Sequence, residues 1–427
     1  MSDCCAESRN KAFDVAVIGA GSAGFSAAIT AADAGARVAL IGHGSLGGTC
    51  VNVGCVPSKA LIRAVETLHG ARASVRFDGI EAVATVTDWS AVTRQQQALV
   101  DDLRQAKYSD VLPAYDRVSY LEGKASFGKD GNLRVDGQTL AANKIVIATG
   151  ARAGVKVTIV SRRGLLPEAE SEIGAALTGY FESEGISFEK ASQYERIRQI
   201  DQSIELTVSA PGGPQTIHAE KVLIATGRTP NTDGLNLPNA KIEVQSNGGI
   251  LIDAQMRTSR QDVYAAGDVT GNDQFVYMAA YGAKLAANNA INGDRLSYDN
   301  SAMPAAVFTD PQVASVGLTE AAAKKAGHTV KVSVLTLDNL PRALAARDTR
   351  GLVKLVADEQ SHRLLGAHIL APEGADSIQT VVMAIKFGMT YDKLGAMIFP
   401  YLTTVEGIKL AAQTFDVNVK RLSCCAG

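Results

Sequence analysis

The first part of the chain alternates short apolar runs with a helical stretch. Residues 13–18 form an apolar run, residues 25–34 have a helical pattern, and residues 37–41 form a second apolar run. Short continuous apolar runs joined through a helix are typical of parallel strands that are buried on both faces. The pattern therefore predicts an α/β domain that opens with a strand–helix–strand unit.

The pattern changes twice further along the chain. Residues 60–110 are mostly helical in pattern, whereas residues 118–140 alternate and contain glycine turns, which predicts a small antiparallel meander. From residue 302 onward strand and helix patterns mix, and this mixture predicts an α+β domain. Its predicted strands are 305–308, 330–337, 352–357 and 364–370, and its predicted helices are 319–326 and 374–387.

A seven-residue pattern occurs twice. Residues 144–150 read K-I-V-I-A-T-G, and residues 221–227 read K-V-L-I-A-T-G. We interpret the two copies as the ends of equivalent strands in two dinucleotide-binding units.

Composition places the chain among ordinary globular proteins. It has 427 residues, 46% of them apolar and 20% charged, which is enough for two to four domains. The net charge of -2 gives no reason to expect nucleic acid or an anionic membrane surface as a partner. We expect no membrane span, because no apolar run reaches 18 residues, and no secretory signal at the polar start. The six cysteines form three close pairs, which favours thiol chemistry in a reducing cytoplasm.

The turn after the first strand reads G-A-G-S-A-G, from Gly19 to Gly24. This is a G-x-G-x-x-G pattern between a strand and a helix, the context of a dinucleotide fold. Gly19 allows the tight turn, Gly21 lets the backbone approach a pyrophosphate, and Gly24 lets the helix pack on the strand. The pyrophosphate would lie at the helix N-terminus.

One feature of that fold is absent. An acidic residue about 20 positions on normally binds a ribose hydroxyl. Here Ile41 is followed by Gly42 and His43. Either the adenosine binds more weakly, or His43 or Ser45 substitutes for the acid.

Two cysteines lie between glycines and a helical stretch, in G-G-T-C-V-N-V-G-C-V-P-S-K at residues 47–59. Cys50 and Cys55 are predicted at the start of that helix, where the helix dipole lowers a thiol pKa. Two thiols one turn apart can close a disulfide or act as a dithiol. The alternative is a pair of small buried cysteines.

This segment resembles the redox-active signature of the flavoprotein disulfide reductases. The resemblance implies FAD and NADPH as cofactors. It implies that Cys50 exchanges with substrate, that Cys55 is a thiolate against the flavin, and that Lys59 lies near the flavin ring. Residues 263–268, V-Y-A-A-G-D, resemble the second flavin motif of the family, so Asp268 would contact the ribityl and phosphate region and can also cap a helix. The resemblance also assigns Gly48, Thr49, Ala125 and Gly150 to the flavin site.

The second dinucleotide unit is incomplete. After Gly150 the chain reaches a second-strand pattern at residues 155–161, with no preceding strand, glycine turn or helix. A βαβ unit takes about 30 residues, so a block is missing. Arg162 and Arg163 after that strand favour NADPH over NADH, or form a solvated basic loop. We expect residues 153–220 to be poorly packed or rearranged, and NADPH-driven activity to be weak or absent.

The carboxyl-terminal end narrows the resemblance to the mercuric reductase branch. Disulfide-reducing members carry a histidine base where this chain has Tyr401, and the chain ends with Cys424 and Cys425 before Ala426 and Gly427. Vicinal thiolates bind soft metals. In that branch the tail of one subunit passes Hg(II) to the buried pair of the other. The resemblance therefore implies a homodimer, with Tyr401 lining the metal path.

The implied reaction converts Hg(II), supplied as a thiol complex whose thiolates are released, and NADPH to Hg(0), NADP⁺ and a proton. Its role would be mercury detoxification and resistance. Two alternatives stay open. One is a dihydrolipoamide or other disulfide reductase of the same family. The other is a flavoprotein that binds Hg(II) through its thiol pairs without turnover.

The sequence thus predicts an α/β protein with a Rossmann-like FAD domain split in sequence, a truncated NAD(P)-binding remnant and an α+β dimerisation domain. Cys4 and Cys5 in the polar tail are either incidental or a soft-metal capture site. The predicted boundaries are 1–11 for the tail, 12–152 and 228–300 for the FAD domain, 153–227 for the remnant and 301–427 for the dimerisation domain.

Overall fold

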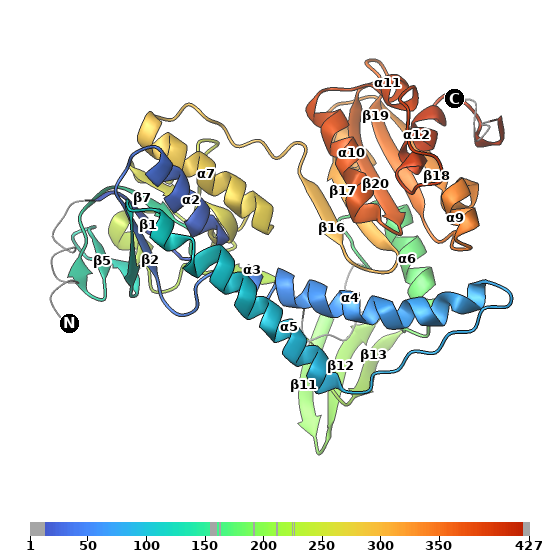
Figure 1. The fold of residues 1–427 in the computed structure, drawn as a ribbon, viewed down its shortest axis with the longest axis horizontal. Coiled ribbons are helices and arrows are strands. Elements are labelled where there is room, and N and C mark those ends of the chain that lie inside the picture. Colours follow the sequence, from blue (N-terminus) through green and yellow to red (C-terminus); the bar gives the residue numbers. More distant parts are fainter. Residues whose placement is uncertain are drawn as a thin grey trace. The chain divides into compact units, whose positions relative to one another are not determined.

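A computed structural model of the chain describes residues 13–153, 160–161, 164–190, 193–210, 212–223, 225 and 227–421 (Figure 1). Six residues with predicted roles lie outside these ranges, namely Cys4, Cys5, Arg162, Arg163, Cys424 and Cys425. The chain divides into two compact units. The first combines residues 1–155 with 225–299, and the second combines 156–224 with 300–427.

The first unit is built on a five-stranded parallel sheet in the order β15-β7-β1-β2-β3. The strands are β1 Phe13–Ile18, β2 Val38–Gly42, β3 Val118–Glu122, β7 Ala142–Ile147 and β15 Val263–Ala265. Helices α2 Ser22–Asp33 and α7 Val276–Asn292 lie side by side on one face of this sheet (Figure 1). Many of their buried residues are alanines, which lets the helices approach closely. The predicted strand–helix–strand opening is confirmed.

A three-stranded antiparallel meander and a 3₁₀ turn contribute to the core on the other face of the sheet. These elements are β4 Ala125–Phe127, β5 Leu133–Val135, β6 Gln138–Thr139 and η5 Leu237–Ala240. The meander predicted at 118–140 is therefore only partly right. Residues 118–122 form β3 and pair in parallel with β2, because alternation along one strand does not specify its neighbour.

Three α-helices and three short helical turns lie between β2 and β3, so residues 60–110 are mostly helical, as predicted. These are α3 Gly48–Asn52, α4 Cys55–Arg72, α5 Trp89–Arg104, η2 Ala73–Arg76, the π-helical η3 Gln105–Ser109 and η4 Leu112–Ala114. Helix α4 buries none of its residues in the single chain. None of the helices in the described part of the chain is long and apolar enough to cross a membrane.

The second unit contains a five-stranded antiparallel sheet in the order β16-β17-β20-β19-β18. Its strands are β16 Pro304–Val307, β17 Gln312–Gly317, β18 Val330–Thr336, β19 Leu352–Asp358 and β20 Leu364–Ala371. Its helices are α8 Glu320–Lys325, α9 Pro341–Ala345, α10 Gly374–Lys386, α11 Tyr391–Gly395 and α12 Glu406–Gln413, with short turns η7 Leu337–Asn339 and η8 Val419–Arg421. The predicted α+β domain is confirmed, and each predicted strand and helix in it is present.

Helix α6 Ser171–Ser183, from the predicted remnant, packs on this sheet. Ile173 and Leu177 are fully buried against Val313, Leu352 and Leu370. The residues next to these three along their strands are Ala314, Val353 and Ile369, and they belong to the core that includes α10 and α12. Because successive residues of a strand point to opposite faces of the sheet, α6 covers the face opposite to α10 and α12. The expectation of poor packing is wrong for this helix.

The rest of the remnant is less buried. It contains β9 Val160–Ser161 paired with β10 Glu189–Lys190, and the antiparallel sheet of β11 Gln193–Ile200, β12 Ser203–Ala210 and β13 Gly213–Ala219. Every residue of β11 is exposed. Residues 221–223, from the second copy of the repeat, are not part of a strand, and Leu223 makes only an isolated β-bridge. After this copy, β14 Arg228–Pro230 pairs with β8 Ala151–Ala153 in the first unit.

Candidate flavin and dithiol site

A cavity of about 660 Å³ opens in the first unit at the carboxyl ends of the parallel strands β1, β2 and β7. Open α/β sheets bind their ligands at this edge. The cavity brings together seven of the predicted flavin residues and both cysteines of the redox segment: Gly19, Gly21, Gly48, Thr49, Ala125, Gly150, Asp268, Cys50 and Cys55. His43 and Ser45, the alternatives for the missing acid, also line it.

The glycine turn has the geometry that its sequence predicts. A side chain at Gly19, whose φ is +117°, would overlap the carbonyl of Ala148, and one at Gly24 would overlap the carbonyl of Gly19. Gly24 does not line the cavity but lies beneath the turn, near Leu40 of β2. Helix α2 has no side-chain cap after Gly21, so its first backbone N–H groups face an anion site.

Gly48 brings the redox segment against this turn. A β-carbon at Gly48 would lie 2.8 Å from the Cα of Gly21, and its φ of +63° also favours glycine. Asn52 closes the loop, because its side-chain amide donates to the carbonyls of Leu46 and Gly48, each at 2.8 Å. Arg104 of α5 donates to the side-chain oxygen of Asn52 at 3.0 Å, and this bond holds the redox segment against α5.

The two cysteines occupy different helices. Cys55 is the first residue of α4, as predicted, whereas Cys50 lies in the short helix α3. Both are free thiols, with Cys50 half-buried and Cys55 exposed. Burial, followed by the side-chain hydrogen bond and the charge of Cys55, raises the pKa of Cys50 to about 12. A backbone hydrogen bond of Cys55 and the charge of Lys59 lower this pKa by less.

The predicted lowering of a thiol pKa is therefore wrong for Cys50. Its thiol is not at the start of the long helix, and desolvation together with a second thiol outweighs the helix dipole. The pair resists losing both protons at neutral pH. A soft metal cation that binds both sulfurs would displace those protons.

Asp268 lies in the 3₁₀ turn η6 Gly267–Thr270 and points to a basic partner that the sequence did not assign. Arg228 Nη2 lies 3.1 Å from Asp268 Oδ2, and both residues line the cavity. Burial raises the pKa of Asp268, and Arg228 opposes this shift without cancelling it. Arg228 follows the second glycine of the repeat, so its position was visible in the sequence, but only the fold shows that it meets Asp268.

Other wall residues gave no signal in the sequence. Tyr120 and Lys124 come from β3 and the loop after it, and Gln274 comes from the loop before α7. Lys59 does not line the cavity; it lies on α4 one turn after Cys55. Tyr401 belongs to the second unit, where its side chain is about half exposed.

Two family models match this chain. The model described as pyridine nucleotide-disulphide oxidoreductase matches residues 13–154 and 151–287, and the model of the dimerisation domain of the same enzymes matches residues 303–412. The chain belongs to the pyridine nucleotide-disulphide oxidoreductases.

Curated members of this family that resemble the chain are mercuric reductases. The mercuric reductase of Shigella flexneri is 42% identical over 97% of this chain and 83% of its own length. That of Acidithiobacillus ferrooxidans is 41% identical over 97% and 84%, and that of Streptomyces lividans is 39% identical over 97% and 98%.

Solved structures of the family also match. A copper(II) complex of the HOCl-induced flavoprotein disulfide reductase RclA from Escherichia coli has a TM-score of 0.81, with 26% identity over 95% of this chain and 99% of that one. A second structure of this reductase gives a TM-score of 0.78 and 25% identity, over 94% of this chain and 99% of that one.

The alignments support a missing block. The alignment with the Shigella relative spans 471 positions, more than the 427 residues of this chain, so the relative contains residues that this chain lacks. The match of the oxidoreductase model is split at residues 151–154, where the sequence predicts the gap.

The family uses a flavin and a pyridine nucleotide as cofactors. The described residues of this chain fit the flavin better than the pyridine nucleotide. The close approach of Gly21 to Gly48, the uncapped start of α2 and the Arg228–Asp268 pair suit a dinucleotide that carries a ribityl chain. Among the described residues from 160 to 223, no helix follows a strand and a glycine-rich turn. Those residues therefore do not fit the phosphates of NADPH.

Proposed function

We propose that the chain reduces Hg(II) to Hg(0) at Cys50 and Cys55, with FAD as its resident cofactor. The observation that carries this proposal is the dithiol segment in the wall of a dinucleotide cavity, in a chain 37–42% identical to mercuric reductases. Thiolates are preferred ligands of soft metal ions. The two electrons that Hg(II) needs would come from the flavin when it is bound.

The two cysteines would divide the work by their exposure. In this chain Cys55 is exposed and Cys50 is half-buried, so Cys55 offers an incoming metal the more accessible sulfur. This is the reverse of the division that the resemblance implies, in which Cys50 meets the substrate. Because the pKa of Cys50 is raised, its proton must leave when the metal binds, so capture of Hg(II) should strengthen as the pH rises. We place this chemistry in the cytoplasm, where thiols stay reduced.

A homodimer is part of the proposal. The second unit matches the dimerisation domain of the family, and it exposes large apolar side chains on α10 and after α11, among them Phe387 at 81% and Ile398 at 98%. Exposed apolar residues of this size mark association surfaces. Across such a dimer, Cys424 and Cys425 of one subunit would deliver Hg(II) from a thiol complex to Cys50 and Cys55 of the other, with Tyr401 beside the path.

A second candidate is a flavoprotein that binds Hg(II) without NADPH-driven turnover. It is favoured by the absence, among the described residues of the remnant, of a phosphate-binding turn. A dihydrolipoamide or other disulfide reductase has less support, because the similar curated relatives are mercuric reductases and Tyr401 replaces the histidine base.

An anaerobic titration of the purified yellow protein with NADPH tests the proposal. Flavin absorbance is followed, with dithionite as the control reductant. If NADPH bleaches the flavin as dithionite does, and Hg(II) then restores the absorbance, the proposed reaction stands. If dithionite alone bleaches it and Hg(II) then restores it, the metal step stands and the second candidate is favoured for turnover with NADPH.

The cysteine variants control for metal binding elsewhere. Cys50→Ala and Cys55→Ala should each abolish reoxidation by Hg(II), while the flavin is still bleached by dithionite. Reoxidation at the wild-type rate in both variants would refute the role of this pair.

A further inference from the structure

The end of strand β2 differs from the usual nucleotide fold. An acidic residue at this position normally binds the ribose of the adenosine, and here the position is Gly42. The sequence alone offers His43 or Ser45 as substitutes. The structure adds a residue from another strand.

Gly42 has no room for a side chain, because Ala20 lies against it and Tyr120 lies over it somewhat less tightly. A β-carbon at Gly42 would lie 2.6 Å from the Ala20 Cβ and 3.3 Å from both Cε2 and the hydroxyl oxygen of Tyr120. Tyr120 belongs to β3, which pairs with β2, and both Gly42 and Tyr120 line the cavity. The glycine and the tyrosine are thus a matched pair, in which the ring occupies the space that a longer side chain at position 42 would need.

We propose that the Tyr120 hydroxyl binds the adenosine ribose of FAD in place of the missing carboxylate. A phenol both donates and accepts, as a ribose hydroxyl requires of its partner. Burial, followed by the charge of Glu122, raises the pKa of Tyr120, so the hydroxyl keeps its proton throughout the physiological range. This inference rests on the flavin-binding part of the proposed function.

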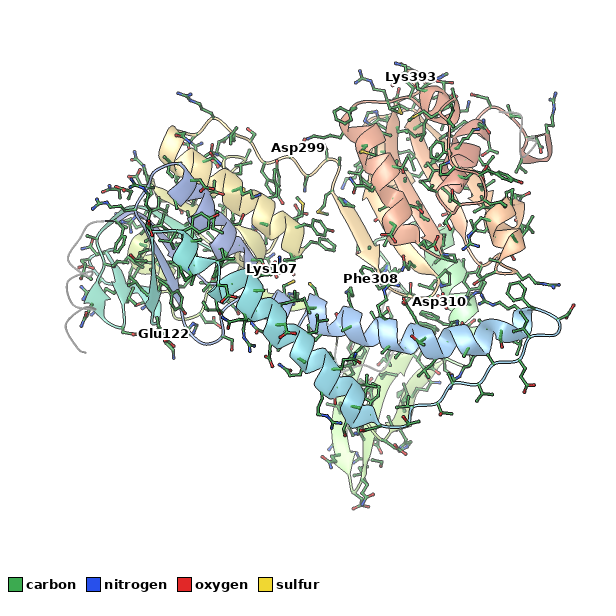
Figure 2. All side chains as sticks on the ribbon, in the orientation of Figure 1. Lys107, Glu122, Asp299, Phe308, Asp310 and Lys393 are labelled. Atoms are coloured by element: carbon green, nitrogen blue, oxygen red, sulfur yellow. The ribbon has the colours of Figure 1, made fainter. Side chains whose placement is uncertain are left out.

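Three neighbours provide competing explanations. Glu122, labelled in Figure 2 at the end of β3, is the register partner of Gly42, but it is not among the residues that line the cavity. His43 and Ser45 line the cavity on the loop after β2. Each can be removed separately without touching the Tyr120 ring.

The test uses the full chain freed of flavin and titrated calorimetrically with ADP and with 2′,3′-dideoxy-ADP. One net hydrogen bond predicts that the wild-type chain binds ADP about three- to tenfold more tightly than the dideoxy form. Tyr120→Phe keeps the ring over Gly42 and should bring this ratio close to one. Tyr115→Phe is the matched control, because Tyr115 packs against the core of the same sheet but does not line the cavity, and it should leave the ratio unchanged.

The ratio is insensitive to a general loss of stability, since both ligands bind the same protein. A wild-type chain that binds both nucleotides equally, or neither, overturns the inference. An affinity ratio that is unchanged in Tyr120→Phe also overturns the inference. This holds whether or not one of the variants Glu122→Gln, His43→Ala and Ser45→Ala brings the ratio to one. The titration involves neither Hg(II) nor NADPH, so its failure is distinguishable from failure of the proposed reaction.

Discussion

Lys354 is a buried cation that joins helix α6 to the sheet of the second unit, and Lys354→Met tests how much it contributes. Its side chain is 2% exposed, and its Nζ lies 3.0 Å from Glu170, 2.8 Å from Glu172 and 3.0 Å from Glu320. Glu170 and Glu172 lie at the start of α6, whereas Glu320 opens α8. Removing the cation would leave three carboxylates close together without their shared partner.

The expected cost is large. Deleting one partner of a buried ion pair destabilises a protein by about 3–5 kcal/mol, because the remaining charge stays buried. For a cooperative unit of this size that loss lowers the melting temperature by roughly 6–20 °C. Lys324→Met is the matched control, since Lys324 bonds the same Glu320 at 2.6 Å but its side chain is 60% exposed. An exposed pair of this kind contributes only about 0.3–0.5 kcal/mol.

The pH dependence provides an independent check. Burial is the largest single effect on Glu172 and would raise its pKa. The bond and charge of Lys354, together with a backbone hydrogen bond and one from Ser171, hold this pKa below the ordinary 4.5. A lowered carboxyl pKa stabilises the fold above the unfolded value and is lost as the pH falls through the folded value. Without Lys354 the largest effects that lower the pKa are lost while burial stays, so the carboxyl pKa rises. The deficit of Lys354→Met should therefore be smaller at pH 5 than at pH 7.5.

The assay is thermal unfolding of both variants at these two pH values, followed by limited proteolysis of α6. The reasoning also predicts that Lys354→Met costs less in a Glu170→Gln, Glu172→Gln background, where fewer charges are left unpaired. Equal melting temperatures for Lys354→Met and Lys324→Met would refute it. A deficit that is the same at both pH values would show that lost packing, rather than unpaired charge, is the cause.

Three further predictions address the cavity. Cys55→Ala removes the side-chain hydrogen bond and charge that raise the pKa of Cys50, so the pH–rate profile for alkylation of Cys50 by iodoacetamide, read at the peptide level, should move to lower pH. An unchanged profile would leave burial as the sole cause. Gly24→Ala should abolish flavin retention, because a β-carbon at this position overlaps the Gly19 carbonyl. Gly70→Ala on the open face of α4 is its control and should stabilise the chain by about 1 kcal/mol. Equal flavin retention in the two variants would contradict the tight turn at Gly24. Asp268→Asn should weaken FAD binding by at least about tenfold through loss of a charged hydrogen bond, measured by fluorescence titration of the apoprotein, and wild-type affinity would remove Asp268 from the site.

Local pattern predicted much of the architecture. The apolar run at 13–18 is strand β1, and the strand patterns predicted after residue 302 are the strands of the second sheet, because apolar pattern reports burial directly. The glycine turn was also predictable, since only glycine fits where Gly24 meets the Gly19 carbonyl. These features depend on neighbours a few residues away or on the period of one element.

The remaining features depend on pairing between distant segments. Nothing in residues 118–122 distinguishes a meander strand from β3, yet this pairing is what brings Tyr120 over Gly42. The same holds for Arg228, which reaches Asp268 across 40 positions. The raised pKa of Cys50 was missed because the sequence shows a helix start but not the burial of the thiol.

The missing block explains why two neighbouring parts of the remnant behave differently. Helix α6 finds a complete surface on the second sheet, because Ile173 and Leu177 meet apolar residues there and Lys354 neutralises its first acidic residues. Residues 221–223 carry a strand pattern but make only an isolated β-bridge at Leu223, as expected where part of a parallel unit is missing. The flavin cavity draws its walls from the first unit alone and needs none of these residues. Flavin binding and reduction by NADPH should therefore be separable in this chain, although both belong to the family.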